Sequence, residues 1–342
     1  MCGRYGLEAH YGTSLGGVPL TEPFTSWNIA PTQQVPILLN RRVPRTAQGQ
    51  LPDAPRRPGV HRLGASTLDT GGTYREIYRA RWGLIPDWHP WDEDPKPPSL
   101  TFNARSETLF EKASYARPAV TGHCAIPTSG YYEWGVQGST VTARGTVKEH
   151  KIPQRIGPPG QYLYLAGLYA WHKINPVSAK ALTGGGHEPQ TGQWLLTFTI
   201  LTMASPRSYT GQDGSPLLRE LGHIHERMPL PLNPAAVNGQ PSTLDVWLGS
   251  GRVAGTPEDS RMPTMGVSDL HDARTALEQL QHAAYPQAAQ WRVRQVSSRI
   301  GNIKNNDKSV LEPDTNLLTL LDSDTYAEHT ANPEGTHALG TD

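Results

Sequence analysis

The first residues that could do chemistry stand at the start of the chain, in the stretch Met1-Cys2-Gly3-Arg4-Tyr5. A small second residue such as cysteine favours removal of the initiator methionine, which would leave Cys2 with a free α-amine next to its thiol. The unperturbed pKa values of these groups are about 8 and about 8.5, so both nucleophiles are partly available near neutral pH. Such an amine converts an aldehyde to a Schiff base, and the neighbouring thiol can then close a five-membered thiazolidine. Taken alone, Cys2 could equally be an incidental small residue at a frayed terminus.

Five further stretches combine arginine, tryptophan and small polar residues in a definite order along the chain. They are Trp27-Asn28-Ile29-Ala30-Pro31-Thr32, Arg81-Trp82-Gly83-Leu84-Ile85-Pro86-Asp87-Trp88, Phe102-Asn103-Ala104-Arg105-Ser106-Glu107-Thr108, Cys124-Ala125-Ile126-Pro127-Thr128-Ser129-Gly130-Tyr131-Tyr132-Glu133-Trp134 and Ile224-His225-Glu226-Arg227-Met228-Pro229. With these motifs, and with Val296-Ser297 and Ile300-Gly301-Asn302 near the end, the sequence resembles the SOS response-associated peptidase (SRAP) family over roughly residues 2 to 312. Human and bacterial members of that family shield abasic sites by crosslinking them.

The resemblance implies a reactive set of Cys2, Asn103, Glu133 and His225 in a positively charged groove. Asn103 would hold the Cys2 amine by a hydrogen bond from its side-chain amide. Glu133 would move protons as a general acid and base close to the sugar. His225 would donate to the sugar oxygen or to the adjacent phosphate. Each residue also has a structural reading: Asn103 as a helix cap, Glu133 as a solvent-facing carboxylate and His225 as part of a surface ion cluster.

The expected partner is single-stranded DNA that contains an abasic site, possibly at a junction with duplex, because a base-free sugar inside a stacked duplex is poorly accessible. Arginines are expected on the phosphates, Trp82 and Pro31 beside flanking bases, and hydroxyl groups on the backbone, although Trp82 could equally belong to the core. The full set of predicted DNA contacts is Gly3, Arg4, Pro31, Trp82, Arg105, Trp134, Thr202, Ser205 and Arg227. No cofactor and no metal site is expected, since Cys2 and Cys124 are the only cysteines.

Two other functions remain open at this point. Cys2 could act as the nucleophile of a cysteine peptidase, including one that removes its own Met1, although no oxyanion-hole signature is evident. The chain could also bind single strands passively, without a covalent step. Within the covalent reading, β-elimination could cut the strand, and Glu133 could help to reverse the thiazolidine.

Composition and charge set the frame for these hypotheses. The 31 basic and 31 acidic residues balance, but six acids and no Lys or Arg fall between Pro313 and Asp342. The first 312 residues therefore carry 31 basic against 25 acidic side chains, a net charge of +6. This pattern predicts a modestly basic SRAP domain over residues 2–312 and an acidic, mobile tail over 313–342. Long apolar runs and a signal peptide are absent from the sequence, so a monomeric cytoplasmic protein without membrane contact is expected, associated with the nucleoid on damage.

Short apolar runs rich in β-branched and aromatic residues predict strands at 35–39, 79–85, 162–171, 194–202 and 291–296. Helices are expected at 108–113, 235–247 and 269–284, the last with Asp269 as N-cap. Segments rich in Pro, Gly, Ser and Thr predict loop insertions at about 45–73, 137–160, 175–192 and 249–263. Six arginines between Arg41 and Arg62 either extend the DNA footprint or belong to a solvated loop. The predicted fold is one α+β domain on a mainly antiparallel, barrel-like sheet, with a few flanking helices.

Overall fold

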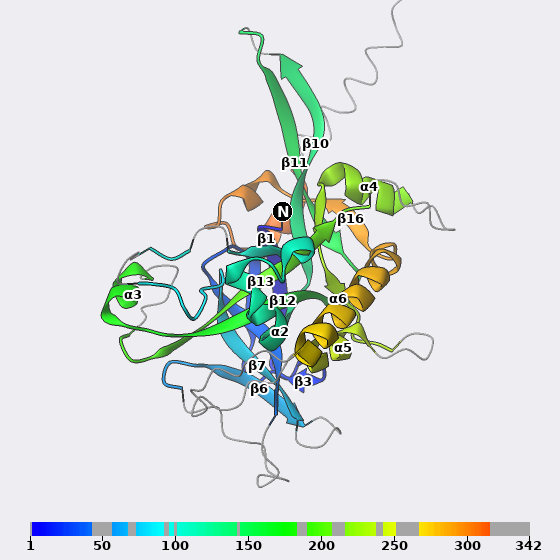
Figure 1. Ribbon diagram of the computed structural model, residues 1–342. Helices are drawn as coiled ribbons and strands as arrows, with labels where there is room; N and C mark the ends of the chain where they lie inside the picture. The colour runs from blue at the N-terminus through cyan, green and yellow to red at the C-terminus, as the bar shows by residue number, and fades with distance from the viewer. Residues whose placement is uncertain are drawn as a thin grey trace, which may run out of the picture.

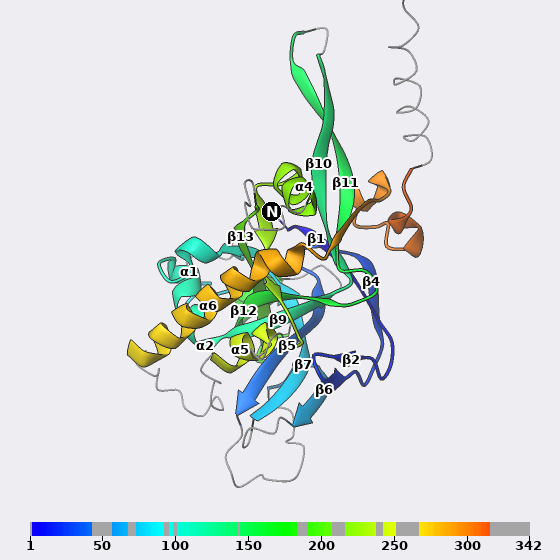
Figure 2. The same cartoon turned by 90° about the vertical axis from the view of Figure 1, so that its right-hand side faces the viewer.

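The computed structural model describes residues 2–42, 57–67, 73–91, 96–98, 101–141, 144–182, 190–206, 216–236, 242–250 and 267–314. Two sheets meet around the amino terminus, and helices cover one side of the larger sheet (Figures 1 and 2). None of the helices in these ranges is both long and apolar enough to cross a membrane.

Five strands of the larger sheet form a closed ring. Their order is β13-β12-β9-β5-β7, and β7 also pairs with β13, which brings the two ends of the series together. The pairing of β7 with β13 is parallel, whereas the other pairings in the ring are antiparallel. The ring strands are β5 (Gln34–Arg42), β7 (Thr73–Trp82), β9 (His123–Thr128), β12 (Leu163–Lys173) and β13 (Trp194–Ala204). The expected mainly antiparallel, barrel-like α+β fold is confirmed.

Four short strands extend this ring. β8 and β14 flank the C-terminal end of β13, β6 pairs with β7, and β15 pairs with β12. Their bounds are β6 (Arg62–Thr67), β8 (Asn103–Arg105), β14 (Arg227–Pro229) and β15 (Pro231–Leu232). β13 is buried along almost its whole length, as a strand covered on both faces should be.

The second sheet has the order β16-β11-β10-β1-β4, and a small β2-β3 hairpin stands apart from it. Its strands are β1 (Arg4–Ala9), β4 (Phe24–Ile29), β10 (Gly130–Val141), β11 (Val147–Gly157) and β16 (Arg292–Gln295), and the hairpin is β2 (Ser14–Leu15) with β3 (Val18–Pro19). Only Ser129 separates β9 from β10, so the chain passes directly from the ring into the second sheet. The Thr128 hydroxyl donates to the Gly6 carbonyl at 2.8 Å and fixes this crossing.

The helices are short except for α6, which runs along the outside of the larger sheet (Figure 2). Inside it, the Trp247 ring of α5 stacks on His123 at 3.8 Å between ring centroids, and its Nε1 donates to the Cys124 carbonyl. The helical segments are η2 (Ser106–Thr108), α1 (Ala113–Ala116), α2 (Pro118–Thr121), α3 (Pro176–Ala181), α4 (Pro216–Ile224), α5 (Thr243–Ser250), α6 (Val267–Ala288), η3 (Ser298–Gly301) and η4 (Lys308–Leu311).

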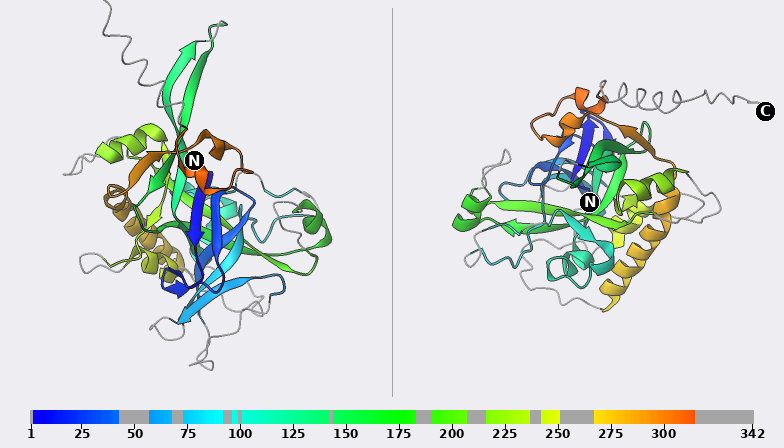
Figure 3. Two further views of the ribbon diagram at one scale, coloured as in Figure 1. Left: turned by 180° about the vertical axis from the view of Figure 1, so that it is seen from behind. Right: turned by 90° about the horizontal axis from the view of Figure 1, so that it is seen from above.

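The long hairpin of β10 and β11 projects far beyond the body of the molecule, as all views agree (Figures 1, 2 and 3). It occupies most of 137–160, so the prediction of a loop there is wrong. Ladder pairing continues from Tyr131↔Ile156 out to Val141↔Val147. An exposed ribbon has no buried face, so its sequence lacks the alternation that would have marked it as strand.

Several other predicted boundaries need correction. Strand β6 lies within the predicted loop 45–73, and helix α3 lies within 175–192. The helix expected at 108–113 is replaced by η2 and α1, and α6 begins at Val267, so Asp269 is not its N-cap. In the region 235–247 the helix begins only at Thr243. Most of 249–263 and the tail from residue 315 lie outside the described residues.

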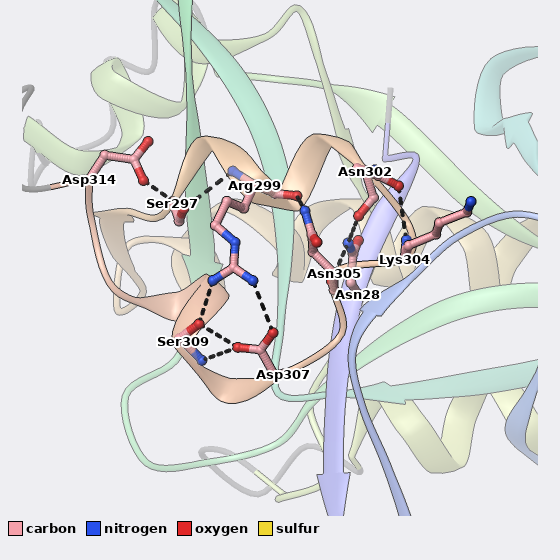
Figure 4. Close-up of polar contacts among 9 residues, drawn as sticks. All are labelled: Asn28, Ser297, Arg299, Asn302, Lys304, Asn305, Asp307, Ser309 and Asp314. Atoms are coloured by element: carbon pink, nitrogen blue, oxygen red, sulfur yellow. Dashed lines mark hydrogen bonds and ion pairs between the residues drawn. The ribbon is translucent and has the colours of Figure 1, made fainter.

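A C-terminal strap, residues 297–314, ties the end of the domain to its first strands (Figures 3 and 4). The buried Asn28 amide donates to the carbonyls of Ile300, Asn302 and Asn305 at 3.1, 2.9 and 2.9 Å. Asn28 Oδ1 and the Ile300 carbonyl in turn accept from the Arg4 guanidinium at 2.8 and 2.9 Å. One asparagine therefore joins β4, β1 and the strap.

The strap is also braced internally. Asp314 accepts hydrogen bonds from the Ser297 hydroxyl and the Ser298 amide, and Arg299 donates to Ser309 and Asp307 (Figure 4). Asp314 therefore belongs to the folded domain, although the sequence placed it in the acidic tail. The hydrogen bonds of its carboxylate with both serines lower its pKa.

We expect Asn28→Ala to lower the free energy of unfolding by about 2–3 kcal/mol, because the carbonyls of Ile300, Asn302 and Asn305 lose their donor and Arg4 loses one acceptor. Urea denaturation measures the loss, and hydrogen exchange should show faster opening of residues 298–312. Asn302→Ala is the matched control: Asn302 is exposed and its side chain accepts only a local bond from the Lys304 amide. Equal losses in the two variants would contradict the role of Asn28.

Candidate active site

Strand pairing brings residues from four distant parts of the chain to one place. β1 pairs antiparallel with β10 with Arg4 opposite Tyr132, so Cys2 and Gly3 lie just beyond this ladder, beside Glu133. Asn103 opens β8, which pairs with β13, and His225 lies between α4 and β14, which pairs with the same end of β13. The amino-terminal end of the chain lies at this meeting point, at the base of the β10–β11 hairpin and beside α4 (Figures 1 and 2).

Asn103 is bonded directly to the residue that would react. Its Nδ2 donates to the Cys2 carbonyl at 2.8 Å, rather than to the amine as predicted from the sequence. Its own carbonyl accepts from the Tyr115 hydroxyl at 3.1 Å, which fixes this part of β8. Asn103 Oδ1 is buried and has no hydrogen-bond partner among the described residues. A buried amide oxygen without a donor is an acceptor ready for an N–H group.

Glu133 is a buried carboxyl group, with an exposed fraction of 5%, and not a solvent-facing one. Burial raises its pKa, and nearby positive charge, including that of His225, acts in the opposite direction. The same burial raises the pKa of the Cys2 thiol well above its ordinary value, and the negative charge of Glu133 adds to that rise. Burial therefore disfavours the charged form of both the Glu133 carboxyl group and the Cys2 thiol.

The orientation of His225 follows from one backbone contact. The amide of Arg227 donates to His225 Nδ1 at 2.9 Å, so Nδ1 is an acceptor. In the neutral ring the proton is then on Nε2, which makes that atom a hydrogen-bond donor. His225 is half-buried, and its charge acts on Glu133. Glu133 and His225 therefore lie close enough to interact electrostatically.

The three arginines expected on DNA phosphates differ in their surroundings. Arg4 donates to Asn28 and to the carbonyls of Ile300 and Gly301, so its fork is occupied by the strap. Arg227 makes a two-pronged ion pair with Glu107 at 2.7 and 2.8 Å and also donates to the Thr202 carbonyl. Arg105 is exposed, at the end of β8 next to Asn103. Of the three, Arg105 is the one whose guanidinium faces solvent.

Three of the predicted DNA contacts are buried. Trp82 has an exposed fraction of 0% and packs among Tyr5, Phe102 and Phe198, so the prediction that it offers a face to a base is wrong. The Thr202 hydroxyl is fully buried and donates to the Ala104 carbonyl at 3.4 Å, so it supports β8 instead of reaching solvent. Ser205 is also buried, and its amide donates to the Glu226 carbonyl.

Six residues beyond Trp82 in the chain, Trp88 has an exposed fraction of 54%; the sequence analysis quoted it in the same motif but did not select it. It follows Asp87, whose carboxylate pairs with Arg117, in a turn just after the buried segment that ends at Pro86. Asp87 and Pro90, which flank Trp88, are turn residues. They were the signal that could have placed Trp88 in an exposed turn and left Trp82 in a strand.

The remaining predicted contacts lie at intermediate depth. Gly3, Pro31 and Trp134 are all half-buried, and Trp134 packs beside the cluster formed by Tyr132 and Val296. Thr32, directly after Pro31, has a φ of 79°, a left-handed conformation that is uncommon for a threonine. Its amide donates to the Trp82 carbonyl at 2.8 Å, which ties this turn to the end of β7.

The arginine-rich stretch 41–62 is partly built into the fold. Arg41 and Arg62 both pair with the buried Glu76, and Arg57 stacks on Trp171 at 3.9 Å. Burial lowers the pKa of Arg57 to about 10. These three arginines therefore have structural partners, and residues 43–56 lie outside the described part of the chain. Among the residues that the structure describes, no group of three or more His, Cys, Asp or Glu side chains is arranged to hold a metal ion.

Comparison with known proteins places this chain beside one family. The family model described as SOS response associated peptidase (SRAP) matches residues 1–303. The chain is 27% identical to abasic site processing protein YMR114C of Saccharomyces cerevisiae over 259 residues, which cover 72% of this chain and 55% of the yeast protein. It is 28% identical to abasic site processing protein YoaM of Bacillus subtilis, over 67% of this chain and 74% of that protein. For abasic site processing protein HMCES of Gallus gallus the identity is 28%, over 53% and 47%.

Among solved structures, a phage-related protein from Bordetella bronchiseptica superposes with a TM-score of 0.44 at 17% identity, covering 87% of this chain and 95% of that one. Of the first curated relatives, YMR114C and YoqW of Bacillus subtilis, the matched part of this chain covers 55% and 60% of the length.

The raised pKa of Glu133 predicts how stability depends on pH. A carboxyl group with a raised pKa in the folded state stabilises the fold most below its unfolded pKa, near 4.5, and that stability is lost as the pH rises through the folded pKa. We therefore expect Glu133→Gln to be more stable than the parent at pH 7.5, with a difference that shrinks toward pH 4.5. Urea midpoints across this pH range measure it. A lower midpoint for the variant at pH 7.5 would contradict the buried, destabilising charge.

Proposed function

Because this chain belongs to the SOS response associated peptidase family, we propose that it processes abasic sites in single-stranded DNA through a covalent bond to Cys2. The observation that carries the proposal is the convergence of Cys2, Asn103, Glu133 and His225 at one end of β13. Abasic site processing is also what the names of its relatives in yeast, Bacillus and chicken state for those proteins.

The chemistry begins with the α-amine, once Met1 has been removed. The amine nitrogen attacks C1′ of the ring-opened deoxyribose aldehyde, and loss of water gives an imine. Asn103 Oδ1, a buried acceptor, suits an N–H of this amine, while the bond from Nδ2 to the Cys2 carbonyl holds the residue in place. Glu133 protonates the departing hydroxyl and His225 Nε2–H donates to the sugar.

The thiol acts second. Its sulfur adds to the imine carbon, its proton passes to the nitrogen, and a thiazolidine with a secondary amine results. Burial keeps the pKa of the Cys2 thiol high, so little thiolate is available to attack first. The same point weighs against a cysteine peptidase, which needs a thiolate or a base that makes one. Removal of Met1 by the chain itself stays compatible with the proposal.

Strand cleavage and reversal can share the same intermediate. If Glu133 removes a C2′ proton from the imine, the 3′ phosphate leaves by β-elimination and the strand is cut. If Glu133 instead delivers a proton to the ring sulfur while the nitrogen lone pair breaks the C–S bond, the thiazolidine reopens to the imine and a free thiol, and water then hydrolyses the imine. Both routes need the carboxyl group to change its protonation state close to neutral pH, and the raised pKa of Glu133 suits this use.

DNA contacts are proposed where side chains reach solvent. Arg105 beside Asn103 would bind a phosphate, and Trp88 would stack on a flanking base in the role first given to Trp82. Arg227 would position the site through Glu107 and the Thr202 carbonyl, and Arg4 would fix the reactive terminus through the strap. The half-buried Gly3, Pro31 and Trp134 would line the path of the strand.

Two substitutions of Cys2 separate the steps. We expect Cys2→Ser to form an imine that borohydride traps but no heat-stable adduct, because a hydroxyl group closes the ring poorly. Cys2→Ala should behave in the same way, whereas the parent should give a heat-stable species on denaturing gels with single-stranded DNA carrying one abasic site. DNA without the lesion is the control. A heat-stable adduct in Cys2→Ala would sink the thiazolidine step.

The dependence on the α-amine is tested by a chain that keeps an extra residue before Cys2. Without a free amine next to the thiol the imine cannot form, and the acid–base groups, which contribute at least about 100-fold to the rate, have no nucleophile to assist. We therefore expect the adduct to form at least about 100-fold more slowly. Mass spectrometry establishes which form is present. If the protein only binds DNA passively, the two forms of the protein should bind equally well, and denaturant should dissociate both complexes.

A further inference from the structure

The β10–β11 hairpin begins at the candidate active site and ends far from it. Glu133 lies on β10 near the base of the hairpin, and the ladder continues without a break in the strands to Val141↔Val147, apart from one bulge between Val136 and Gly138. At about 3.3 Å per residue, the stretch from Glu133 to Val141 spans roughly 26 Å. The arm, defined as residues 136–141 and 144–151, extends away from the chemistry and is continuous with the strand that carries Glu133.

Both sides of the arm face solvent. All of its described residues are exposed, among them Val136, Val141 and Val147 at 49, 70 and 61%. Figures 1 and 2, which differ by a quarter turn, both show the two strands standing clear of the body. An isolated two-stranded ribbon buries little apolar surface and is marginally stable at best. The length of the arm therefore adds little to the stability of the domain and calls for another explanation.

The two faces of the arm differ in charge. Residues directly opposite each other share a face, and Thr140↔Lys148 and Gly138↔His150 form one face, where His150 Nε2 contacts the Thr140 hydroxyl at 3.1 Å. This basic face (Gly138, Thr140, Lys148 and His150) contains no acid. The other face has the valine pair Val141↔Val147, and its Lys151 is neutralised by Glu149 at 3.3 Å.

The geometry points to a nucleic-acid contact: we propose that the basic face of the arm, with Arg144 at the turn, binds the phosphate backbone of duplex DNA that flanks the abasic site. The inference rests on the proposed function. Lys148 and Arg144 supply exposed positive charge, Thr140 supplies a hydroxyl, and Gly138 has open space where a side chain would stand, so a phosphate can approach the backbone.

Duplex suits the arm better than a single strand. Duplex DNA rises about 3.4 Å per base pair, so an arm of roughly 26 Å reaches past about seven base pairs. The double helix is stiff over this distance, so its phosphates keep a fixed relation to the lesion, whereas a flexible strand must be ordered at an entropic cost. A two-stranded β ribbon is also narrow enough to follow a major groove. The partner is therefore the duplex side of a junction next to the lesion.

The experiment measures equilibrium binding of full-length protein to fluorescent DNA that carries the stable tetrahydrofuran analogue of an abasic site, so it does not depend on the covalent step. One probe has a duplex flank of about 12 base pairs, longer than the arm, on the 5′ or on the 3′ side. The other is a single strand of about seven nucleotides, which offers no duplex flank for the arm to bind. Lys148→Gln and Lys151→Gln form a matched pair, since each removes one lysine of β11 from opposite faces.

We expect Lys148→Gln to weaken binding of the duplex-flanked probe about 3-fold, and Arg144→Gln with Lys148→Gln about 10-fold, with a salt slope reduced by about 1 and about 2. Binding of the short strand should stay unchanged in both, and Lys151→Gln should stay within 2-fold on either probe. The proposal is overturned if the short strand weakens equally, if Lys151→Gln matches Lys148→Gln, or if neither flanked probe responds. Crosslinking of a natural abasic site by the parent, run in parallel, tests the proposed function separately.

Discussion

The antiparallel pairing of β1 with β10 is the constraint from which the candidate site follows. Register places Arg4 opposite Tyr132, so the first residues of the chain lie beside Glu133 and nowhere else. Neither partner could be displaced alone, because β1 is also held by β4, and β10 by β11. A chain terminus is ordinarily the least ordered part of a protein. Here β1 is an interior strand of a five-stranded sheet, so Cys2, two residues before it, is held in a defined position.

Burial changes the acid–base properties of the groups around Cys2. Glu133 and the Cys2 thiol are both removed from water, and for both groups the charged form is disfavoured. In the proposed function the carboxyl group would donate and accept protons, and the thiol would react only after the amine has formed the imine. The polar groups that remain, Asn103 and His225, are oriented by contacts to backbone atoms, of Cys2 and of Arg227. Because the fold holds these backbone atoms in place, the contacts fix the side-chain orientations of Asn103 and His225.

Apolar runs in the sequence predicted four of the five ring strands, β5, β7, β12 and β13, but not β9. The candidate set of Cys2, Asn103, Glu133 and His225 came from the resemblance to the family. Runs such as Tyr162 to Trp171 are apolar because they are covered on both faces, and that pattern survives in the sequence. The arm was missed for the opposite reason, since strands exposed on both faces carry polar residues such as Lys148 and Glu149. Trp82 and Trp88 share one motif, yet Trp82 is buried and Trp88 is exposed, because Trp82 ends strand β7 and Trp88 lies in the turn after it. Likewise, Arg4 bonds to Asn28 and Arg227 pairs with Glu107. Each partner is distant in the sequence, so residue type alone could not predict the pairing.

The strap has a consequence for the order in which the protein becomes competent. During synthesis the residues at the amino terminus leave the ribosome first, whereas the carbonyls of Ile300 and Gly301 that hold Arg4 are made almost last. Until then, β1 lacks the clamp two residues away from Cys2. An α-amine with a neighbouring thiol reacts with many small aldehydes of metabolism. If Cys2 reacts as proposed, its amine and thiol would therefore take up their final geometry only when nearly the whole domain has been translated.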